Sequence, residues 1–344
     1  MSFTNIRKIP TPEEILEMEP FPADLKAIKE KNDAEIKAIL SGEVNKLIVI
    51  IGPCSADNEN SVCDYISRLK KVNDKVKDKL FIVPRIYTGK PRTTGEGYKG
   101  MLHQPDPEKT PNMLEGILSI RRMDIRAIRE TGFPIADEML YPTNLPYVED
   151  LLSYIAVGAR SVENQLHRLA SSGIDVPVGM KNPTSGDLTV MFNSIQAANA
   201  KHNFFYHAHE VMTSGNPFAH AILRGSVNKH GDNVPNYHYE DLSRATEMYN
   251  KKGFPNPAII IDTNHSNSKK RYFEQPRIVK EVLFSRKYNP KISAIVKGFM
   301  IESYIEPGNQ KVDENVYGKS ITDPCLGWSE TEELLYYMAE NVTF

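Results

Sequence analysis

The stretch LIVIIGPCS, residues 47–55, decides how this chain is expected to fold. Its first five residues are all apolar and four of them are β-branched, a pattern typical of a strand that is buried on both faces of a parallel sheet. The Gly52-Pro53 pair ends the strand and is followed at once by Cys54. Taken alone, Cys54 is either a small buried core thiol or a residue placed there to hold a ligand.

Similar short apolar runs recur along the chain, and segments with helical periodicity, such as SVCDYISRLKKVNDKV at 61–76, separate them. About eight β-α units predict a closed (β/α)8 TIM barrel. An open doubly wound sheet is the alternative, but no G-x-G-x-x-G follows a strand, which counts against a dinucleotide fold. The expected strands lie at residues 47–51, 81–86, 134–139, 154–160, 176–181, 220–225, 258–263 and 293–303.

The N-terminal region differs from the rest of the chain. The segment TPEE at 11–14 has the residues of a helix capping box, and an amphipathic helix is expected from 23 until Gly42 ends it. Its apolar stripe needs a surface, which is either its own barrel or a neighbouring subunit. We therefore predict an N-terminal extension over 1–45, with a role in assembly or regulation, and a catalytic barrel over 46–344.

Composition excludes several classes of protein. The chain has 344 residues, 40% of them hydrophobic and 25% charged, with a net charge of −2, so no basic field points to nucleic acid. No apolar run approaches the roughly 20 residues of a membrane span, and the N-terminus lacks the apolar core of a secretory signal. Three scattered cysteines do not form a disulfide framework, so a cytoplasmic location is expected.

Basic residues follow the ends of several expected strands, where a barrel enzyme carries its chemistry. So many cations at one mouth repel each other unless anions such as phosphate or carboxylate bind between them. The backbone N–H groups of Gly158 and Ala159, ahead of an expected helix at 161–173, can add anion ligands. The cations are Arg85, Lys90, Arg92, Lys99, Arg160, Lys181 and Arg224.

A second set of residues suits a metal ion. One thiol, one imidazole and two carboxylates at the same mouth form a donor set of mixed hardness, which favours a divalent metal that acts as a Lewis acid. Each of these residues also has an ordinary structural role available to it, and no local CxxC or HExxH motif supports the site. The four residues are Cys54, His265, Glu302 and Asp323.

Eight motifs in this order resemble those of one family. They are GPCS, KPRTT, GARSVENQLHR, VGMKN, ILRG, DTNHSNS, IES and KSITDPCLGW. Together they resemble the class I, bacterial and fungal, feedback-regulated 3-deoxy-D-arabino-heptulosonate 7-phosphate (DAHP) synthases, from the extension to about Trp328. The resemblance implies a (β/α)8 enzyme that condenses phosphoenolpyruvate with D-erythrose 4-phosphate to DAHP and phosphate, the first step of the shikimate pathway.

The resemblance also implies roles for individual residues. Cys54, His265, Glu302 and Asp323 would hold a divalent metal, Mn²⁺ in first place and Fe²⁺, Co²⁺ or Zn²⁺ as alternatives. The catalytic set would be Lys90, His265 and Cys54. Erythrose 4-phosphate would contact Lys90, Pro91, Arg92, Thr93 and Asp323. Phosphoenolpyruvate would contact Arg85, Lys90, Lys99, Glu138, Gly158, Ala159, Arg160, Lys181 and Arg224. A homodimer or homotetramer is expected, with no nucleic-acid or membrane partner.

Two other functions are considered. One is 3-deoxy-D-manno-octulosonate 8-phosphate synthase, which uses arabinose 5-phosphate, but KPRTT at 90–94 argues against it because that family resembles K-A-N-R there. The other is a non-catalytic barrel that binds sugar phosphates. The alternating His207 and His209 would share a face on a strand, and an exposed pair is favoured there over a second metal site.

Feedback control is expected to differ from that of the family. In the resembling enzymes the extension, a hairpin and the segment before strand five form a pocket for an aromatic amino acid. In SSGIDVPVG, at 171–179, Asp175 stands where a small Ser is usual. Because a carboxylate there would repel the carboxylate of an amino acid, the sequence predicts that phenylalanine inhibition is weak or absent.

Overall fold

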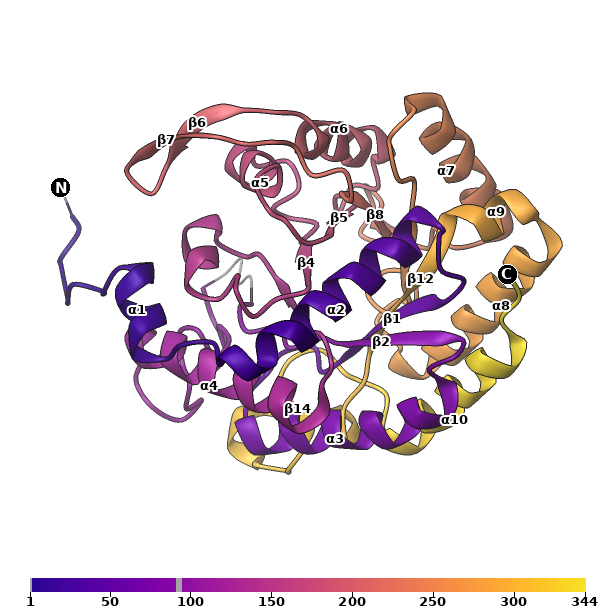
Figure 1. The fold of residues 1–344 in the computed structure, drawn as a ribbon. Helices are drawn as coiled ribbons and strands as arrows, with labels where there is room; N and C mark the ends of the chain where they lie inside the picture. Colours follow the sequence, from indigo (N-terminus) through magenta and orange to yellow (C-terminus); the bar gives the residue numbers. More distant parts are fainter. Residues whose placement is uncertain (1, 91–94) are drawn as a thin grey trace.

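The computed structural model describes residues 2–90 and 95–344 (Figure 1). Eight parallel strands form one sheet in the order β2-β1-β12-β11-β8-β5-β4-β3. The two ends of this sheet meet, because Arg85 and Ala136 form a parallel bridge and the Ile86 N–H donates to the Ala136 carbonyl at 2.8 Å. The predicted (β/α)8 barrel is thus confirmed, and the open sheet is wrong.

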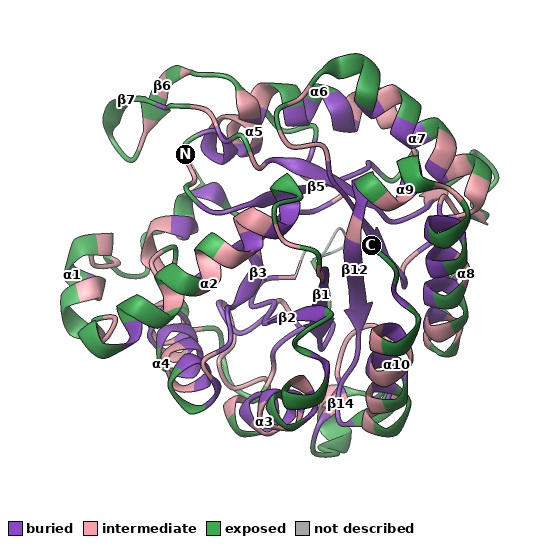
Figure 2. Cartoon of the chain, turned by 45° about the vertical axis from the view of Figure 1, so that its right-hand side comes forward, coloured by how far each residue is buried: buried purple, intermediate pink, exposed green. Residues whose placement is uncertain are grey.

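Helices surround the barrel and expose only their outer faces, while the strands inside are buried (Figure 2). The barrel strands are β1 (Leu47–Gly52), β2 (Leu80–Pro84), β3 (Ala136–Glu138), β4 (Tyr154–Val157), β5 (Val178–Lys181), β8 (His220–Leu223), β11 (Ile259–Asp262) and β12 (Val296–Glu302). The outer helices are α3 (Glu59–Val76), α4 (Met113–Thr131), α5 (Gln165–Ser171), α6 (Leu188–Asn199), α7 (Tyr239–Lys252), α8 (Gln275–Tyr288), α9 (Pro290–Ile295) and α10 (Trp328–Asn341).

The last predicted strand, at 293–303, is partly wrong. Its first residues belong to the short helix α9, and β12 begins only at Val296. Asn289 caps α9 by accepting a hydrogen bond from the Lys291 N–H at 3.0 Å, and Pro290 occupies the first helical position. These two helix-start signals outweigh the β-branched residues that follow them.

The predicted capping box is confirmed at the start of α1 (Pro12–Met18). The Glu14 N–H donates to Thr11 Oγ1 at 3.3 Å, and the Thr11 N–H donates to Glu14 Oε2 at 2.7 Å. The longer helix α2 (Ala23–Ser41) ends at Gly42, which has a left-handed φ of 86°. The helix therefore ends at the residue that the sequence indicates.

The apolar stripe of α2 is buried on its own barrel. Ile36, Ile39 and Leu40 belong to the same buried cluster as Ile48 and Phe81, which lie near the N-terminal ends of β1 and β2. In Figure 1, α2 crosses the barrel and covers this end. Of the two surfaces expected for the stripe, its own barrel thus covers these three residues. The division into an extension and a barrel at residue 45 stays a prediction.

Between α6 and β8 the chain makes an exposed hairpin of β6 (Asn203–Tyr206) and β7 (His209–Met212), which projects from the barrel (Figure 1). Its turn is His207-Ala208, with φ of 46° and 60°. The two histidines therefore do not share one strand face, and both are exposed. Within residues 2–90 and 95–344 they belong to no cluster of metal-ligand atoms.

Further short elements lie in the connections that follow the barrel strands. They are the hairpin β9 (Ser226–Val227) and β10 (Asn233–Val234), the pair β13 (Glu306–Asn309) and β14 (Lys319–Ser320), and the 3-10 helices η1 (Pro142–Tyr147), η2 (Tyr272–Glu274) and η3 (Val312–Glu314). None of the helices in the described part of the chain has both the length and the hydrophobicity of a membrane span.

Candidate active site

The carboxyl ends of β1 and β12 lie side by side. Gly52 is the register partner of Glu302, and Cys54 follows two residues later. A Cβ atom on Gly52 would lie 2.4 Å from the Arg85 carbonyl oxygen, so only glycine permits this close approach of β1 and β2. The tight packing brings Cys54, Arg85 and Glu302 to one point of the mouth.

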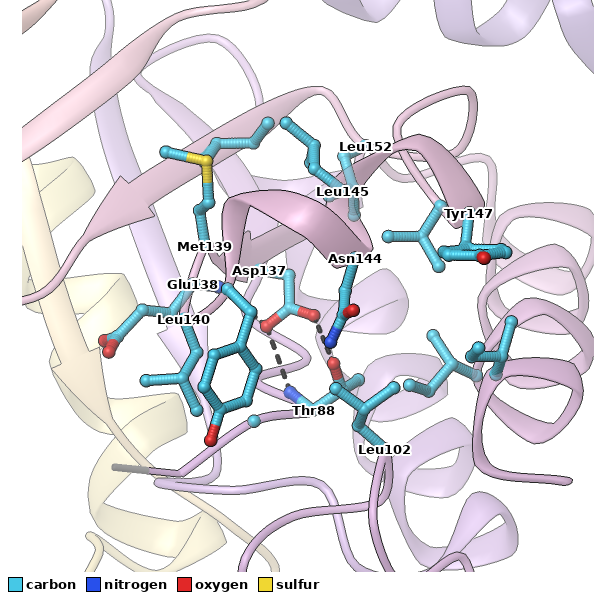
Figure 3. A pocket seen from close by; sticks show the side chains of 16 residues that line it. Thr88, Leu102, Asp137, Glu138, Met139, Leu140, Asn144, Leu145, Tyr147 and Leu152 are labelled. Atoms are coloured by element: carbon cyan, nitrogen blue, oxygen red, sulfur yellow. Dashed lines mark hydrogen bonds between the residues drawn. The ribbon is translucent and has the colours of Figure 1, made fainter. Parts of the chain in front are cut away.

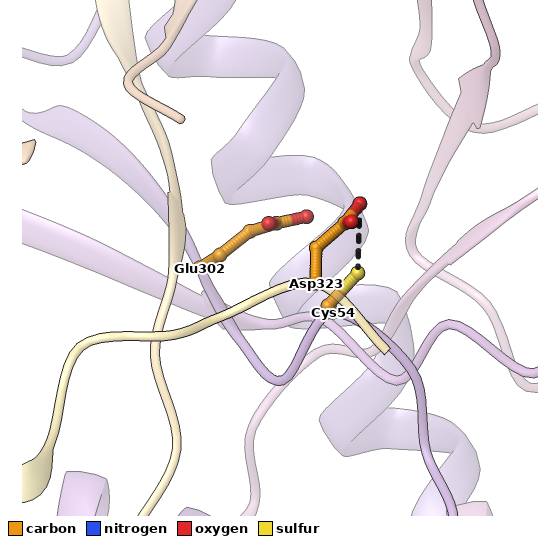
Figure 4. A group of neighbouring side chains, drawn as sticks. All are labelled: Cys54, Glu302 and Asp323. Atoms are coloured by element: carbon orange, nitrogen blue, oxygen red, sulfur yellow. Dashed lines mark hydrogen bonds between the residues drawn. The ribbon is translucent and has the colours of Figure 1, made fainter. Parts of the chain in front are cut away.

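Three of the four predicted metal ligands form a compact group. The ligand atoms of Cys54, Glu302 and Asp323 all lie within 4.8 Å of one another. Figure 4 shows them converging from the two strand ends and from the loop after β14, with Cys54 Sγ 3.7 Å from Asp323 Oδ2. Cys54 and Glu302 are buried, whereas Asp323 is partly exposed. The group thus opens toward the mouth on the side of Asp323.

The fourth predicted ligand, His265, lies apart from this group. It has a left-handed φ of 43°, and its Nδ1 lies 2.8 Å from Asp262 Oδ2. It is nevertheless close to this group: against the effect of burial, Arg85, then His265, lower the pKa of Glu302, and Lys90 and Lys270, then His265, lower that of Asp323. His265 therefore sits at the same mouth, turned toward Asp262, and its role as a ligand stays a prediction.

The electrostatics of the three-residue group fit a bound cation. Burial, followed by the charge of Glu302, raises the pKa of the Cys54 thiol. Glu302 Oε1 is buried, accepts no hydrogen bond within the described residues, and forms an ion pair with Arg85 Nη2 at 3.1 Å. A divalent ion would stabilise the thiolate and give this oxygen a further partner. One sulfur and two carboxylate oxygens also suit a metal of intermediate hardness.

Two cations of the predicted substrate set reach this group. Lys90 Nζ donates to both Cys54 Sγ and the Cys54 carbonyl, each at 2.8 Å. Arg85 Nη2 lies 3.1 Å from Glu302 Oε1, and its guanidinium stacks 3.8 Å from the centroid of the Tyr87 ring. Arg85 Nε and Nη1 are buried and have no partner among the described residues. These two donors are therefore available to an anion.

A second cluster lies at the ends of β3, β4, β5 and β11. Lys181 Nζ lies 3.5 Å from Asp262 Oδ2 and 3.7 Å from Glu138 Oε2. Gly158 leaves room for Glu138, since a Cβ atom there would lie 2.6 Å from Glu138 Oε1. Arg224 Nη1 donates to Ser266 Oγ at 3.3 Å. Four of the predicted substrate residues therefore gather on this side of the mouth.

The sequence analysis missed Asp262 as a site residue. Burial opposes its ionisation, but His265 and Lys181 hold the pKa of its carboxyl well below the usual value. It therefore carries a buried negative charge between two residues of the predicted site. One feature of the sequence indicates that Asp262 belongs to the site. It is the only charged residue of the run AIIID at 258–262, and it stands directly at the end of a strand.

The other predicted residues lie at the rim or outside the described residues. Lys99 is half-buried and Arg160 is exposed, and neither forms a salt bridge within the described ranges. Gly158 and Ala159 are followed by a turn, and α5 begins only at Gln165. The expected helix start at 161 is wrong because Asn164 caps the helix, accepting from the Leu166 N–H at 3.0 Å. Pro91, Arg92 and Thr93 lie outside the described residues.

Behind Glu138, Asp137 connects β3 to the segment that leads to Lys90 (Figure 3). Its carboxylate accepts hydrogen bonds from the Thr88 N–H at 3.0 Å and from the Thr88 hydroxyl at 2.5 Å. It also lines a mostly apolar cavity of about 40 Å3 between β3, α4 and η1. Burial raises the pKa of Asp137 from 3.8 to about 7. Asp137 thus holds the end of β3 to the backbone at Thr88. Burial of its carboxyl disfavours the charged form.

Replacing Asp137 with asparagine is expected to flatten the pH dependence of stability. Because the folded pKa lies above the unfolded one, the stabilisation by this group is complete below about pH 4 and is lost as the pH rises toward 7. As the pH rises from about 4 to 7, the free energy of unfolding of Asp137→Asn should therefore increase relative to that of the wild type by up to about 4 kcal/mol.

Urea unfolding across this pH range measures the difference. Asp74→Asn, an exposed carboxyl on α3, is the matched control and should run parallel to the wild type. A curve for Asp137→Asn that also runs parallel to the wild type would contradict the prediction.

A closed barrel with unpaired arginine donors and a candidate metal group at its carboxyl mouth is the arrangement of a (β/α)8 enzyme for anionic substrates. The family model described as the DAHP synthetase I family matches residues 22–336. The chain belongs to this family.

Individual relatives support this assignment. The chain is 39% identical over 316 residues to the Trp-sensitive phospho-2-dehydro-3-deoxyheptonate aldolase of Enterobacter agglomerans, covering 90% of this chain and 87% of that protein. It is 37% identical over 335 residues to the Phe-sensitive enzyme of Escherichia coli K12, covering 94% and 92%. The solved structure of the aldolase from Francisella tularensis SCHU S4 superposes with a TM-score of 0.92 at 29% identity, covering 99% of this chain and 98% of that one.

Proposed function

We propose that this chain condenses phosphoenolpyruvate with D-erythrose 4-phosphate to DAHP and phosphate, the first step of the shikimate pathway. The observation that carries the proposal is the convergence of Cys54, Glu302 and Asp323 with Lys90 and Arg85 at the mouth of the barrel. The printed names of the relatives, phospho-2-dehydro-3-deoxyheptonate aldolases, support the same product.

The residues at the mouth divide between the two substrates. Phosphoenolpyruvate carries a phosphate and a carboxylate, which match the unpaired Nε and Nη1 of Arg85 and the cluster of Lys181 and Arg224. The other groups proposed for it are Lys99, Glu138, Gly158, Ala159 and Arg160. Erythrose 4-phosphate is assigned to Lys90, Pro91, Arg92, Thr93 and Asp323.

A divalent metal, with Mn²⁺ as the proposed ion and Fe²⁺, Co²⁺ or Zn²⁺ as alternatives, would be held by Cys54, Glu302 and Asp323, with His265 as the fourth ligand. Bound there, it supplies Lewis-acid polarisation of the aldehyde oxygen of erythrose 4-phosphate. The partial opening at Asp323 leaves this side of the group accessible to the acceptor.

The chain's own residues orient the substrates and move the protons. Lys90, whose ammonium lies next to Cys54, donates a proton to the oxygen that becomes an alkoxide as the enol carbon attacks the aldehyde. Water then adds to C2, and phosphate leaves with its bridging oxygen. His265 and Glu138 are the groups proposed to activate this water. The cations hold both substrates in line, which contributes much of the rate.

The proposal is tested by incubating the protein and Mn²⁺ with phosphoenolpyruvate and either erythrose 4-phosphate or arabinose 5-phosphate. We expect the seven-carbon product by mass spectrometry and a kcat/KM at least about 100-fold higher with erythrose 4-phosphate. A preference for arabinose 5-phosphate would support 3-deoxy-D-manno-octulosonate 8-phosphate synthase. Binding of both substrates without turnover would support a sugar-phosphate-binding barrel.

Phenylalanine is expected to inhibit this enzyme weakly or not at all. Asp175 is exposed before β5, and burial, followed by the charges of Asp150 and Asp175, raises the pKa of Glu149. Carboxylates therefore gather where the resemblance places the amino-acid pocket, and they would repel the carboxylate of an inhibitor. Asp175→Ser should lower the phenylalanine concentration for half inhibition by about tenfold or more.

Activity at subsaturating phosphoenolpyruvate, titrated with phenylalanine, tyrosine and tryptophan in turn, measures this effect. Asp74→Ser removes an exposed carboxylate elsewhere and is the control. Strong inhibition of the wild type by micromolar phenylalanine would show that Asp175 does not block the pocket.

A homodimer or homotetramer remains part of the proposal. Phe205 and Met212 on the projecting hairpin are 75% and 78% exposed, and Phe3 and Ile6 near the N-terminus are each 91% exposed. Large apolar side chains grouped on projecting segments are typical of subunit contacts. Light scattering on the purified protein, compared with a Phe205→Ser and Met212→Ser double variant, gives the oligomeric state.

A further inference from the structure

A second charged cavity lies at the end of the barrel opposite the candidate active site. It has a volume of about 540 Å3 and lies between the C-terminal end of α2, the start of β1, the α8–α9 corner and residues 343–344. Within the described ranges its lining includes four basic side chains and no acidic one. The four are Lys46, Arg286, Lys287 and Lys297.

Arg286 is the central residue of this cavity. It is only 4% exposed, and neither its Nε nor its Nη1 has a hydrogen-bond partner in the described structure. Burial lowers its pKa to about 10, and no neighbouring carboxylate opposes this effect. Its guanidinium carbon lies 5.8 Å from the centroid of the Phe344 ring. This stacking occupies one face of the guanidinium, while its Nε and Nη1 stay unpaired among the described residues.

Lys297, the second residue of β12, adds a second cation. It is half-buried, and burial followed by the charge of Arg286 lowers its pKa. Two cations thus line the same cavity, and within the described residues neither forms a salt bridge. Lys46 does not resolve the imbalance, since its ammonium lies 2.7 Å from Glu35 Oε1 and is already paired. Buried cations are almost always paired, because an unpaired one loses its hydration without compensation.

We infer that this cavity binds a small phosphate-bearing anion between the Arg286 guanidinium and the Lys297 ammonium. The N–H groups of an arginine donate to phosphate oxygens, and an adjacent lysine adds a point charge. A dianion balances both cations. The volume accommodates a phosphate ester as well as inorganic phosphate. Because Lys46 and Lys297 lie at the starts of the strands, this site is separate from the substrate groups at their carboxyl ends.

The thermal midpoint Tm of the full chain tests this inference. The protein carries its metal and saturating phosphoenolpyruvate, without erythrose 4-phosphate, so that the phosphoenolpyruvate site is filled and no turnover occurs. Any rise in Tm from phosphate at the open acceptor site is shared by the wild type and the variants, so the response of the cavity is the rise in the wild type beyond that in the variants. Inorganic phosphate and glycerol phosphate are titrated separately, with sodium chloride at equal ionic strength as the salt control. We expect phosphate-class ligands to raise Tm by about 2 °C or more beyond chloride at saturation. The ligand that acts at the lower concentration distinguishes a free phosphate from an ester.

Two variants locate the effect. Arg286→Met and Lys297→Met should each lose the phosphate-dependent rise in Tm that the cavity contributes, while Lys291→Met, an exposed lysine of α9 outside the cavity, should keep it. Without phosphate, Arg286→Met should have an equal or higher Tm than the wild type, because it removes an uncompensated buried charge. If Arg286→Met does not fold, the response of the Tm of Lys297→Met to phosphate is sufficient to test the inference. An equal response in the wild type and in Lys297→Met, or no response in the wild type, would overturn the inference.

Discussion

Alanine at position 54 is expected to lower kcat by about 1000-fold while the fold is retained. The Cys54 side chain lies within 4.8 Å of the ligand atoms of both Glu302 and Asp323, and no other sulfur ligand is available in this group of described residues. Losing it removes a thiolate ligand and with it several kcal/mol of transition-state charge stabilisation. The measurement is kcat over a titration of Mn²⁺, together with the metal content of the dialysed protein.

Cys63→Ala is the matched control, because Cys63 is equally buried but lies on α3 in the core. It should keep its metal content and nearly all of its activity. Circular dichroism and Tm show whether either variant is misfolded. Near wild-type turnover of Cys54→Ala in metal-limited buffer would contradict the assignment of Cys54 as a ligand.

Removing the ammonium of Lys90 should be nearly as damaging. Lys90 Nζ contacts both the sulfur and the carbonyl of Cys54 at 2.8 Å, so it lies where the aldehyde oxygen is expected to develop charge. Loss of a general acid typically costs about 100- to 10,000-fold in rate. Lys90→Met should therefore lower kcat by about this factor, with a smaller change in the KM for phosphoenolpyruvate.

Lys90→Arg separates charge from proton donation, since arginine keeps the charge but does not release a proton near neutral pH. It should recover substrate binding without recovering kcat. Lys109→Met, whose side chain is 79% exposed and pairs with Asp106, should behave as the wild type. If Lys90→Met changed only KM and left kcat intact, Lys90 would be a binding residue and the proposed protonation would be wrong.

Much of the candidate site could be predicted because the barrel makes sequence position informative. Residues that end buried strands meet at one mouth whatever their separation in the chain, so Cys54, Lys181 and Glu302 could be placed together from the strand pattern alone. The N-terminal helix starts and stops could also be predicted, because Thr11, Glu14 and Gly42 act on backbone groups within one turn of themselves. These signals act on neighbouring residues only, and the start of α1 and the end of α2 lie where they predict.

Other features depended on partners that no local pattern reveals. The side chain of His265 is turned toward Asp262, a choice set by the charges around it at the mouth. The stripe of α2 is buried on its own barrel because the starts of β1 and β2 present an apolar surface of matching size. In the sequence, Arg286 is an ordinary charged residue of a predicted helix. In the fold it is buried next to the end of α2, α9 and the start of β12, and no described side chain there carries an opposite charge.

The sequence by itself therefore determined which residues lie at the carboxyl ends of the strands, because its hydrophobic pattern predicts the order of strands and helices. Only the tertiary structure decided which of those residues are paired and which are left with free donors or acceptors. Cys54 and Asp323 meet although they are 269 positions apart in the chain, and Nε and Nη1 of Arg286 stay unpaired in the described structure. The physical reason is that hydrogen bonding and desolvation depend on atoms within a few ångströms, and folding supplies those atoms from distant segments.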